Sequence, residues 1–512
     1  MKSIFTMGLA GIMLTGLTGC NDDNNKSDNN DAVLRDIISA QNLTADASAG
    51  RDIPSIKSAK AQLGMQLFFT TALGGDQDSA CVSCHHPALG GGDDLSLPIG
   101  VGADAPELLG PGRTHSDSVV PTVPRNAPTT FNIALWDQVL FHDGRVESLS
   151  KIPGKNGSAG GIRTPDSPFG SADAQAGNNL VVAQARFPVT SAAEMRGTAF
   201  ESGNSNTAVR DHLSQRLAGL VAELSTPDAD SSGTNDWQEQ FEAVYKAEAD
   251  VGNLITYARI ADAIAAYENS QVFVATPWAD YVAGDDDALT QTQKEGARLF
   301  FTTQADGGAG CSSCHGGDFF TDEKFYNIAM IQFGEGKGDG ADGDDDFGRY
   351  RETKELADQY AFRTPTLLNV AVTGPYGHTG AYDTLEGVIR HHLNASDAVD
   401  DFFATSVTWC QSVAQLSSVS DCDALYPNAE SNTRAALSKL ADDQESGLSE
   451  LLDTDLSDSE VAALVSFMQA LTDPCVTDAS CLAQWIPDES AGGAGGQQLN
   501  AVDENSQPLT SN

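Results

Sequence analysis

The sequence predicts a mainly α-helical protein built from two similar units, and three observations support this fold class. Apolar residues recur three and four positions apart in many segments, which is the helical period. No segment shows the sustained two-residue alternation of a half-buried strand. The third observation is an internal repeat, because Gly64 and Gly296 each lead into Leu-Phe-Phe-Thr-Thr, a Gly-rich loop and Cys-x-x-Cys-His. The 512 residues are enough for both units and for tails.

The repeated Cys-x-x-Cys-His motif is the attachment signature of c-type haem. The two thiols add to the haem vinyl groups, and the histidine becomes the proximal iron ligand. One copy alone would also fit a redox dithiol or chance, but two copies in matching surroundings favour haem. The residues are Cys81, Cys84 and His85 in the first copy and Cys311, Cys314 and His315 in the second. We therefore expect two cytochrome c-like haem domains with long connecting loops, at residues 48–270 and 271–487.

The first 47 residues have the pattern of an exported, lipid-anchored protein. Residues 1–20 read as a lipoprotein signal peptide, with Lys2, an apolar run and a lipobox-like end at Cys20. The apolar run is too short for a membrane span. Residues 21–47 are expected to form a polar tether and a leading helix. Lipidation of Cys20, followed by Asn21, places the protein on the periplasmic side of the outer membrane, held by a lipid anchor only.

Helical spacing and composition predict the remaining elements in order. Helices are expected at 32–41, 56–69, 207–224, 236–249, 254–270, 433–452 and 457–471, and a further helix begins at Leu289 before the second haem motif. Residues 90–128 are rich in Gly and Pro and should form loops over the first haem. Residues 334–346, rich in Gly and Asp, are expected to form an exposed acidic loop, with a calcium site as the alternative. Residues 488–512 have the composition of a disordered tail.

The cysteine count fits an exported protein, and the net charge argues against one class of partner. Of nine cysteines, one is assigned to lipid and four to haem. The remaining four lie in two close pairs, so disulfides Cys410–Cys422 and Cys475–Cys481 are expected in an oxidising compartment, with free thiols as the alternative. The formal net charge of −43 argues against nucleic acid as a partner, because nothing offsets phosphate repulsion.

Five further phrases, in this order with the two haem motifs, resemble the di-haem bacterial cytochrome c peroxidase/MauG family. The phrases begin at Pro124, Phe141, Glu194, Phe362 and Thr373 and read PRNAPT, FHDGR, EM, FRTPT and TGPYGH. The resemblance covers roughly residues 56–471. It implies two c-type haems, a reaction with hydrogen peroxide, and a peroxide-binding first haem.

At the first haem the sequence departs from many of these peroxidases. Where they have a second histidine ligand, this sequence has Val101, which cannot bind iron, so the resemblance implies an open position. His115 is an alternative sixth ligand, and His86 is expected on the loop surface. The resemblance assigns the proton shuttle to Glu194, since a positioned carboxylate can move a proton between the two peroxide oxygens. The family's helper glutamine aligns near Ile152, so that role is lost or moved.

The second haem also differs from the peroxidase pattern. The family's sixth ligand, methionine or tyrosine, aligns with His392, and His391 is the alternative because adjacent helical residues point about 100° apart. Histidine in place of methionine lowers the haem potential. The paired histidines and the long Gly-rich segment resemble the methanobactin-associated MbnH-like enzymes. Those enzymes use peroxide to oxidise a tryptophan on a copper-binding partner protein.

Two further sites follow from the resemblance. The family passes electrons between its haems through a tryptophan in an F-W-D-G-R phrase, and here His142 occupies that place, with Trp136 six residues earlier. A calcium ion lies between the two domains in this family. Its ligands map to the side chain of Asn126 and to the carbonyl groups of Thr373 and Pro375, and oxygen ligands suit calcium.

Three functions are compatible with these residues. The leading one is a di-haem oxidoreductase of the MauG/MbnH type, which uses hydrogen peroxide to oxidise a partner protein through a high-valent haem pair. The alternative is a peroxidase that reduces hydrogen peroxide with electrons from a small cytochrome c or copper protein. A plain di-haem electron carrier is the third, and the open first iron and Glu194 count against it.

Overall fold

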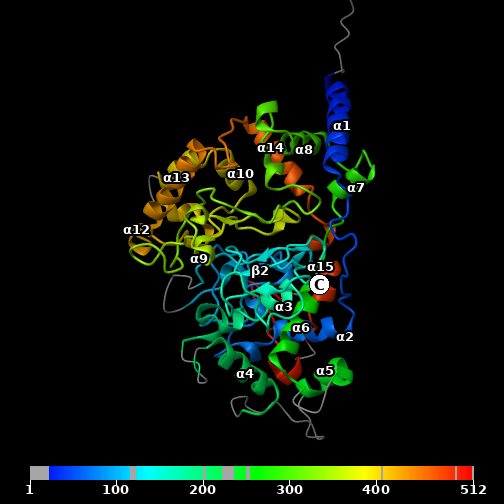
Figure 1. Cartoon of the computed structure of the whole chain (residues 1–512), viewed down its shortest axis with the longest axis vertical. Helices are drawn as coiled ribbons and strands as arrows, with labels where there is room; N and C mark the ends of the chain where they lie inside the picture. The colour runs from blue at the N-terminus through cyan, green and yellow to red at the C-terminus, as the bar shows by residue number, and fades with distance from the viewer. Residues whose placement is uncertain are drawn as a thin grey trace, which may run out of the picture.

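The computed structural model describes residues 22–115, 123–198, 200, 203, 205–221, 236–248, 254–404, 408–489 and 493–509, with the backbone alone for 22–29. Two units are stacked along the long axis of the molecule (Figure 1). The first haem unit forms the lower half, and the second forms the upper half. The expected signal peptide and its Cys20 lie outside the described residues.

The described chain is mainly helical, as the sequence predicts. The helices of the first half are α1 (Asp22–Gln41), α2 (Ala59–Phe69), α3 (Leu180–Gln184), α4 (Asn206–Leu217), α5 (Asp236–Tyr245) and α6 (Tyr257–Asn269). Those that follow are α7 (Pro277–Ala283), α8 (Gln291–Phe301), α9 (Tyr350–Thr353), α10 (Leu385–Leu393), α11 (Ala395–Phe403), α12 (Cys422–Leu425), α13 (Ala429–Glu445), α14 (Asp458–Gln469) and α15 (Ala479–Leu482).

The strands are short. An antiparallel sheet joins β1 (Val139–Leu140), β2 (Val146–Ser148) and β3 (Ile162–Arg163) in that order, and a second pairs β4 (Phe325–Tyr326) with β5 (Phe362–Arg363). In the second sheet Phe325 lies opposite Arg363, and Tyr326 lies opposite Phe362.

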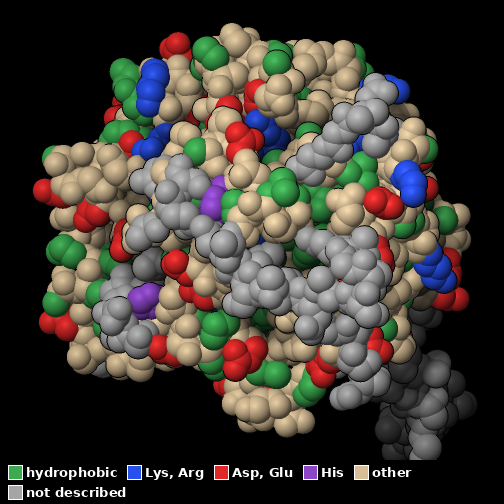
Figure 2. Space-filling view, turned by 90° about the horizontal axis from the view of Figure 1, so that it is seen from below, with side chains coloured by type: hydrophobic (Ala, Val, Ile, Leu, Met, Phe, Trp, Pro, Cys, Tyr) green, Lys and Arg blue, Asp and Glu red, His purple; other side chains and the backbone are tan. Residues whose placement is uncertain are grey.

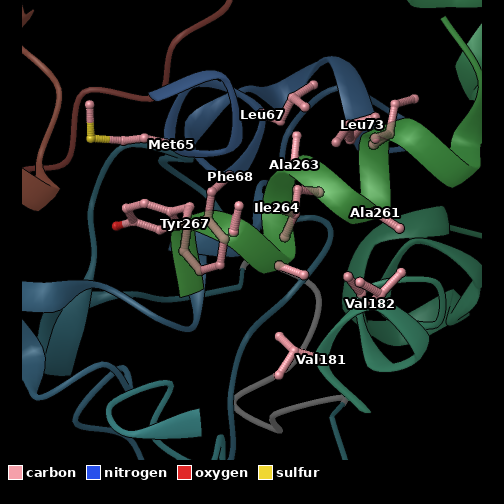
Figure 3. Packing of buried hydrophobic residues seen from close by; sticks show 14 of the residues in the cluster. Met65, Leu67, Phe68, Leu73, Val181, Val182, Ala261, Ala263, Ile264 and Tyr267 are labelled. Atoms are coloured by element: carbon pink, nitrogen blue, oxygen red, sulfur yellow. The ribbon is translucent and has the colours of Figure 1, made fainter. Parts of the chain in front are cut away.

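The sequence repeat is a structural repeat of two crossed helix pairs, α2 with α6 and α8 with α14. At Gly64, a Cβ atom would lie 1.9 Å from the Ala263 carbonyl oxygen, and at Gly296 it would lie 2.0 Å from that of Ala463. Each pair therefore crosses at a glycine where the two backbones touch. In the first pair, the rings of Phe68 and Tyr267 lie 5.0 Å apart and pack with the apolar side chains of both helices (Figure 3).

Each helix pair is the centre of its own hydrophobic core. The first core gathers α2 to α6, and the second gathers α7, α8 and α14 together with Leu34 of α1. A third cluster surrounds the Cys410–Cys422 disulfide and includes Leu97 from the first unit. Phe319 packs against both main cores, so the two units share a continuous interior.

The C-terminal segment is ordered where described, which corrects the expectation of a disordered tail at 488–512. After α14 the chain returns to the first unit, where Trp485, Leu499 and Ala501 are buried in its core. The Leu499 amide donates to the carbonyl group of Phe69 (2.8 Å), and the Leu109 amide donates to that of Val502 (3.0 Å). The boundary of the second unit expected at 487 is therefore also wrong, because the chain leaves that unit after α14.

The leading segment is likewise more structured than a polar tether. Helix α1 begins at Asp22, and its later part lies along the second unit (Figure 1). Asp31 accepts a hydrogen bond from the Tyr281 hydroxyl (2.7 Å) and lies 2.8 Å from the Lys294 ammonium group. Helix α1 thus belongs to the second unit, although it precedes the first in sequence.

Two predicted helices are shorter than their apolar patterns suggested. Helix α4 ends at Leu217 rather than 224, and α13 spans Ala429–Glu445 rather than 433–452. Glycines with positive φ follow both ends, Gly219 (+69°) and Gly447 (+67°), and such residues terminate helices.

The surface reflects the acidic composition. On the face seen from below the first unit, acidic side chains are scattered among uncharged ones without forming one continuous patch (Figure 2). Within the described ranges, no helix combines the length and apolar character that a membrane crossing requires.

Replacing Gly64 with Ala tests the crossed helix pair. Alanine normally favours a helix over glycine by about 1 kcal/mol, but here its Cβ would overlap the Ala263 carbonyl group. We expect the free energy of unfolding to fall by roughly 1–3 kcal/mol, as for other overpacked cores. Chemical denaturation followed by circular dichroism measures this change. Gly387→Ala in α10 is the control, because its Cβ meets side-chain atoms at 3.1 Å or more. Equal stability of the Gly64 variant and the wild type would contradict the close crossing.

Candidate haem centres

The first haem motif follows α2 in a loop that orients its histidine. Cys81 and Cys84 lie on a short 3-10 turn, and neither is in a disulfide. The Nδ1 atom of His85 lies 3.2 Å from the Gly91 carbonyl oxygen, so Nδ1–H donates and Nε2 is left for iron. Burial lowers the pKa of His85 to about 4, which keeps the ring neutral, as a metal ligand must be.

The second motif repeats this arrangement after α8. His315 Nδ1 lies 3.1 Å from the Pro365 carbonyl oxygen and 3.2 Å from that of Phe320. Burial lowers the pKa of His315 to about 4. Cys311 and Cys314 flank the same turn and are free thiols.

A second histidine faces His315 from α10. The ring centres of His315 and His392 lie 6.5 Å apart. A metal–imidazole bond is about 2.0 Å, so two rings that share one metal ion have centres roughly 6 Å apart. The His392 Nδ1 atom donates to the Val388 carbonyl group (2.8 Å), which leaves Nε2 free. These residues fit a haem iron with two histidine ligands.

His391, the alternative ligand, points elsewhere. Its Nδ1 atom lies 2.8 Å from the Tyr382 hydroxyl, and its Nε2 atom lies 2.8 Å from the Ile328 carbonyl oxygen. Both ring nitrogens are therefore occupied, and the side chain is fully buried. The geometry favours His392 over His391 as the ligand.

The loop that carries Val101 lies against the turn that carries Glu194. The Val101 amide donates to the Ala193 carbonyl group (3.2 Å), and a Cβ on Gly100 would lie 2.8 Å from the Glu194 Cα. Glu194 belongs to a π-helical turn, Ala192–Arg196, whose Ser191 caps its amide (3.4 Å).

The charge of Glu194 reaches the first haem cysteines. Burial raises the pKa of Cys81 and that of Cys84, and the Glu194 carboxylate raises both further. The half-buried Glu194 therefore lies near the first attachment site, and its role as proton shuttle stays a prediction.

Three other residues were considered at the first haem, namely His115, His86 and Ile152. His115 lies near Val101, with its Nε2 atom 2.7 Å from the position of a Cβ on Gly102. His86 is 1% exposed, which corrects the expectation of a surface position. Its Nδ1 atom accepts from the Ala88 amide (3.1 Å) and caps the next turn. Ile152 is 43% exposed and lies on the surface.

Two charged residues near this cavity were missed by the sequence reasoning. Arg113 donates through Nε to the Ile99 carbonyl group (2.7 Å) and through Nη2 to that of Gly100 (3.0 Å), which fixes the loop before Val101. Lys337 belongs to the second unit, and the negative charge of Glu194 acts to raise its pKa. Burial and the charges of Arg125 and Arg145 lower its pKa to about 8. Nothing in the local sequence marks either residue.

The loop 334–346 is therefore only partly the exposed acidic loop that its composition suggested. Residues 341–343 are exposed, but Asp345 and Asp346 are buried. Asp346 pairs with Arg125 of the first unit, with 2.6 Å between Oδ2 and Nε. The loop serves as a contact between the two units.

Both candidates for the inter-haem path lie at this contact. His142 Nε2 lies 3.0 Å from the Asn126 carbonyl oxygen, and the His142 carbonyl group accepts from the Arg363 amide (2.8 Å). The Trp136 ring lies 5.3 Å from the ring of Phe319, and the Arg363 guanidinium lies 3.5 Å above it. Trp136 therefore contacts the aromatic residue that joins the two cores.

Asn126, one of the expected calcium ligands, lies at this contact, and none of the contacts described here joins it to Thr373 or Pro375. The Asn126 amide nitrogen donates to the Leu95 and Ser96 carbonyl groups (2.9 and 3.3 Å), which leaves its oxygen for a cation. The Thr373 Cα would lie 3.5 Å from a Cβ on Gly90, in the loop after His85. Among the described residues, no three His, Cys, Asp or Glu side chains group as a metal site, so calcium at Asn126, Thr373 and Pro375 stays a prediction.

The structure joins Cys410 to Cys422 and Cys475 to Cys481, with Cα atoms 5.6 and 5.3 Å apart. These are the pairs that the sequence predicts. The second pair lies at the point where the chain returns from the second unit to the first.

Comparison with known proteins agrees with these two centres. The family described as di-haem cytochrome c peroxidase matches residues 58–287. Cytochrome-c peroxidase IdrP1 of Denitromonas iodatirespirans is 30% identical over 355 residues, with 65% of this chain and 72% of the relative covered. The chain belongs to the di-haem cytochrome c peroxidase/MauG family. It is therefore a haem-dependent oxidoreductase that acts with peroxide, and its family membership implies two c-type haems.

The relatives of this enzyme include MauG proteins as well as cytochrome c peroxidases. The methylamine utilization protein MauG of Methylorubrum extorquens is 25% identical over 338 residues, with 66% of this chain and 69% of the relative covered. The crystal structure of a MauG-like protein associated with microbial copper homeostasis is 20% identical, with a TM-score of 0.51 over 85% of this chain and 96% of the other. This likeness confirms the mainly helical di-haem fold.

Electron paramagnetic resonance of the ferric enzyme tests the two coordination sites. We expect one high-spin signal from the haem beside Val101 and one low-spin signal from the haem between His315 and His392. His392→Ala should convert the low-spin signal to high-spin, because the sixth ligand is lost. His391→Gln is the matched control and should keep the low-spin signal. Loss of the low-spin signal in the His391 variant alone would reverse the assignment.

Proposed function

We propose that this enzyme uses hydrogen peroxide to oxidise a partner protein, in the manner of the MauG branch of the family. The observation that carries the proposal is the position of His392 opposite His315, at 6.5 Å between ring centres. Two histidine ligands stabilise ferric iron, whereas a methionine ligand raises the potential. A second haem that stays ferric is poorly suited to receive electrons from a small high-potential cytochrome.

Three residues of the first unit, Val101, Arg113 and Glu194, have different roles in peroxide activation. A haem held by Cys81, Cys84 and His85 would supply the redox chemistry that peroxide reduction requires. Val101 cannot bind iron, which leaves one position open, and the Arg113 bonds to Ile99 and Gly100 hold the loop in place. Glu194 can accept the proton from one peroxide oxygen and return it to the other.

Lys337 would contribute a positive charge, and Trp136 and His142 would contribute a path for electrons. Since its pKa lies at about 8, Lys337 is mostly cationic at neutral pH and adds a positive charge near this site. Trp136 and His142 lie at the contact between the two units and would carry electrons between the haems. The two electrons that reduce peroxide to water come in the end from the partner protein.

The partner and its location follow from the resemblance to MbnH-like enzymes. That resemblance suggests a copper-binding protein whose tryptophan is oxidised, and the fold shared with a MauG-like protein associated with copper homeostasis is compatible with it. The lipobox at Cys20 would hold the enzyme on the periplasmic side of the outer membrane. A calcium ion at Asn126, Thr373 and Pro375 would complete the contact between the units.

The same residues also fit the second candidate function, a cytochrome c peroxidase, which is the name of the relative at 30% identity. The two functions differ in whether the second haem must be reduced before peroxide reacts. A protein oxidase starts with both irons ferric, whereas a reductive peroxidase needs a donor first.

The deciding experiment mixes fully ferric enzyme with a small excess of hydrogen peroxide and no donor. We expect a long-lived oxidised state with near-infrared absorbance, from charge shared between the two haems. His392→Met should shift the enzyme toward donor-dependent turnover, because methionine raises the potential. Fast peroxide consumption that requires pre-reduction, with no oxidised state from the ferric enzyme, would make the peroxidase the correct function.

Replacing Glu194 with Gln tests the proton shuttle. The amide keeps the size of the side chain but cannot carry the proton, so stopped-flow formation of the oxidised state should slow by a factor of roughly 10² to 10⁴. Both haems should load, and the spectrum of the second haem should be unchanged. Glu107→Gln is the control, since this exposed carboxylate lies in the same unit. An unchanged rate in the Glu194 variant would show that another group moves the proton.

A further inference from the structure

A tyrosine lies beside the second haem attachment site, and the function described above does not use it. Tyr326 is half-buried in strand β4, opposite Phe362 of β5. Its hydroxyl is bonded to Asp322, whose amide donates to the Cys314 carbonyl group (2.9 Å). Because Cys314 is an attachment residue for the second haem, the phenol lies beside that attachment site.

An aspartate accepts the phenolic proton. The Tyr326 hydroxyl donates to Asp322 Oδ2 at 2.7 Å. The pair is held rigidly, because the Asp322 amide donates to the Cys314 carbonyl group (2.9 Å) and the Lys324 amide donates to Asp322 Oδ1 (2.9 Å). Burial and this hydrogen bond both raise the pKa of Tyr326, so the phenol keeps its proton at neutral pH.

The pair is also close to the surface. The Asp322 side chain is 17% exposed, and the neighbouring Lys324 side chain is 69% exposed with its ammonium group 3.5 Å from Asp322 Oδ2. A partner protein can thus approach within a few side chains of the phenol.

Other tyrosine–aspartate pairs in the chain set this one apart. Tyr245 donates to Asp262 at 2.8 Å, Tyr281 to Asp31 at 2.7 Å and Tyr360 to Asp345 at 3.1 Å. The charged groups described around these three phenols are aspartates, arginines and lysines, whereas the aspartate of Tyr326 is bonded to the backbone of Cys314. The pair at Tyr326 joins a phenol, a proton acceptor and a haem attachment site in one cluster.

Oxidation of a phenol is favourable only when its proton leaves with the electron, because the cation that would otherwise form is a strong acid. A carboxylate already bonded to the phenolic proton provides for this transfer without rearrangement. We propose that Tyr326 and Asp322 form a proton-coupled relay, which carries single electrons from the partner protein to the second haem centre. The proposal rests on the proposed function and names the point at which the partner's electrons enter.

The step balances in electrons and protons. One electron leaves Tyr326 toward the centre held by Cys314 and His315, and the phenolic proton moves to Asp322. The neutral phenoxyl radical then takes one electron from an aromatic group of the partner protein, and the proton returns from Asp322 to the phenol. Two such cycles supply the two electrons that one molecule of hydrogen peroxide consumes.

The test is freeze-quench electron paramagnetic resonance of the holoenzyme after peroxide, without a partner. We expect an organic radical whose hyperfine splitting changes when the protein contains ring-deuterated tyrosine. Tyr326→Phe should abolish this signal, and Asp322→Asn should diminish it because the amide cannot take the proton. A nitroso spin trap should give an adduct on Tyr326 that peptide mass spectrometry locates.

Tyr360→Phe is the matched control, since it removes a phenol that is bonded to an aspartate of another loop, Asp345, and its signal should equal that of the wild type. A tyrosine radical of full yield in the Tyr326 variant, or an adduct elsewhere only, would overturn the relay. The ferric spectra of all variants should be unchanged, which shows that both haems have loaded. If the wild type forms no oxidised state at all without a donor, the proposed function fails first. If that state forms but neither Tyr326→Phe nor Asp322→Asn alters the radical, the relay alone fails.

Discussion

The buried ion pair of Arg125 with Asp143 and Asp346 is the interaction on which the arrangement of the two haem units depends. Arg125 is 6% exposed and lies 2.6 Å from a carboxylate oxygen on each side, one from each unit. Although burial acts to raise it, the charge of Arg125 lowers the pKa of Asp346 to about 2. Removing one partner from such a buried pair costs about 3–5 kcal/mol, because a charge is left uncompensated.

The residues of the inter-haem contact are attached to this ion pair through the backbone. Asn126 follows Arg125 directly, and His142 precedes Asp143, so the pair positions both. The Arg125 guanidinium also lies 5.6 Å from the centre of the Phe362 ring, in the strand beside Tyr326. One cation therefore connects the calcium region, the candidate electron path and the edge of the second haem centre.

Two copies of one motif give two different centres because their neighbours differ. Near Cys81 and Cys84, the loop of Val101 lies against the turn of Glu194. Facing His315, the helix α10 presents His392. The two centres thus differ in the segments that approach them from outside each motif.

Much of the fold and of the two haem centres could be predicted because the motifs that indicate them are short and contiguous in the sequence. The repeated glycine, the Leu-Phe-Phe run and the haem motif identified α2 and α8, and the glycine proved to be where each helix touches its partner. The choice of His392 could not be settled from sequence, since it depends on Tyr382 and Ile328 occupying both nitrogens of His391.

The predictions that were wrong concern residues whose contact partners are distant in the sequence. The segment 493–509 looks disordered because its few apolar residues are widely spaced, yet Leu499 and Ala501 fill gaps in the first core. Asp345 and Asp346 look exposed by composition, but Arg125 lies more than two hundred residues away in the chain. Composition cannot reveal a partner that only the tertiary structure provides.

The central claim is that the second centre holds its iron between two histidines and remains ferric under working conditions. Spectroelectrochemical titration of the holoenzyme measures it directly. The account predicts that the second haem has a midpoint potential well below that of small cytochromes c with histidine–methionine ligation. A potential equal to or above that of those cytochromes would contradict the account.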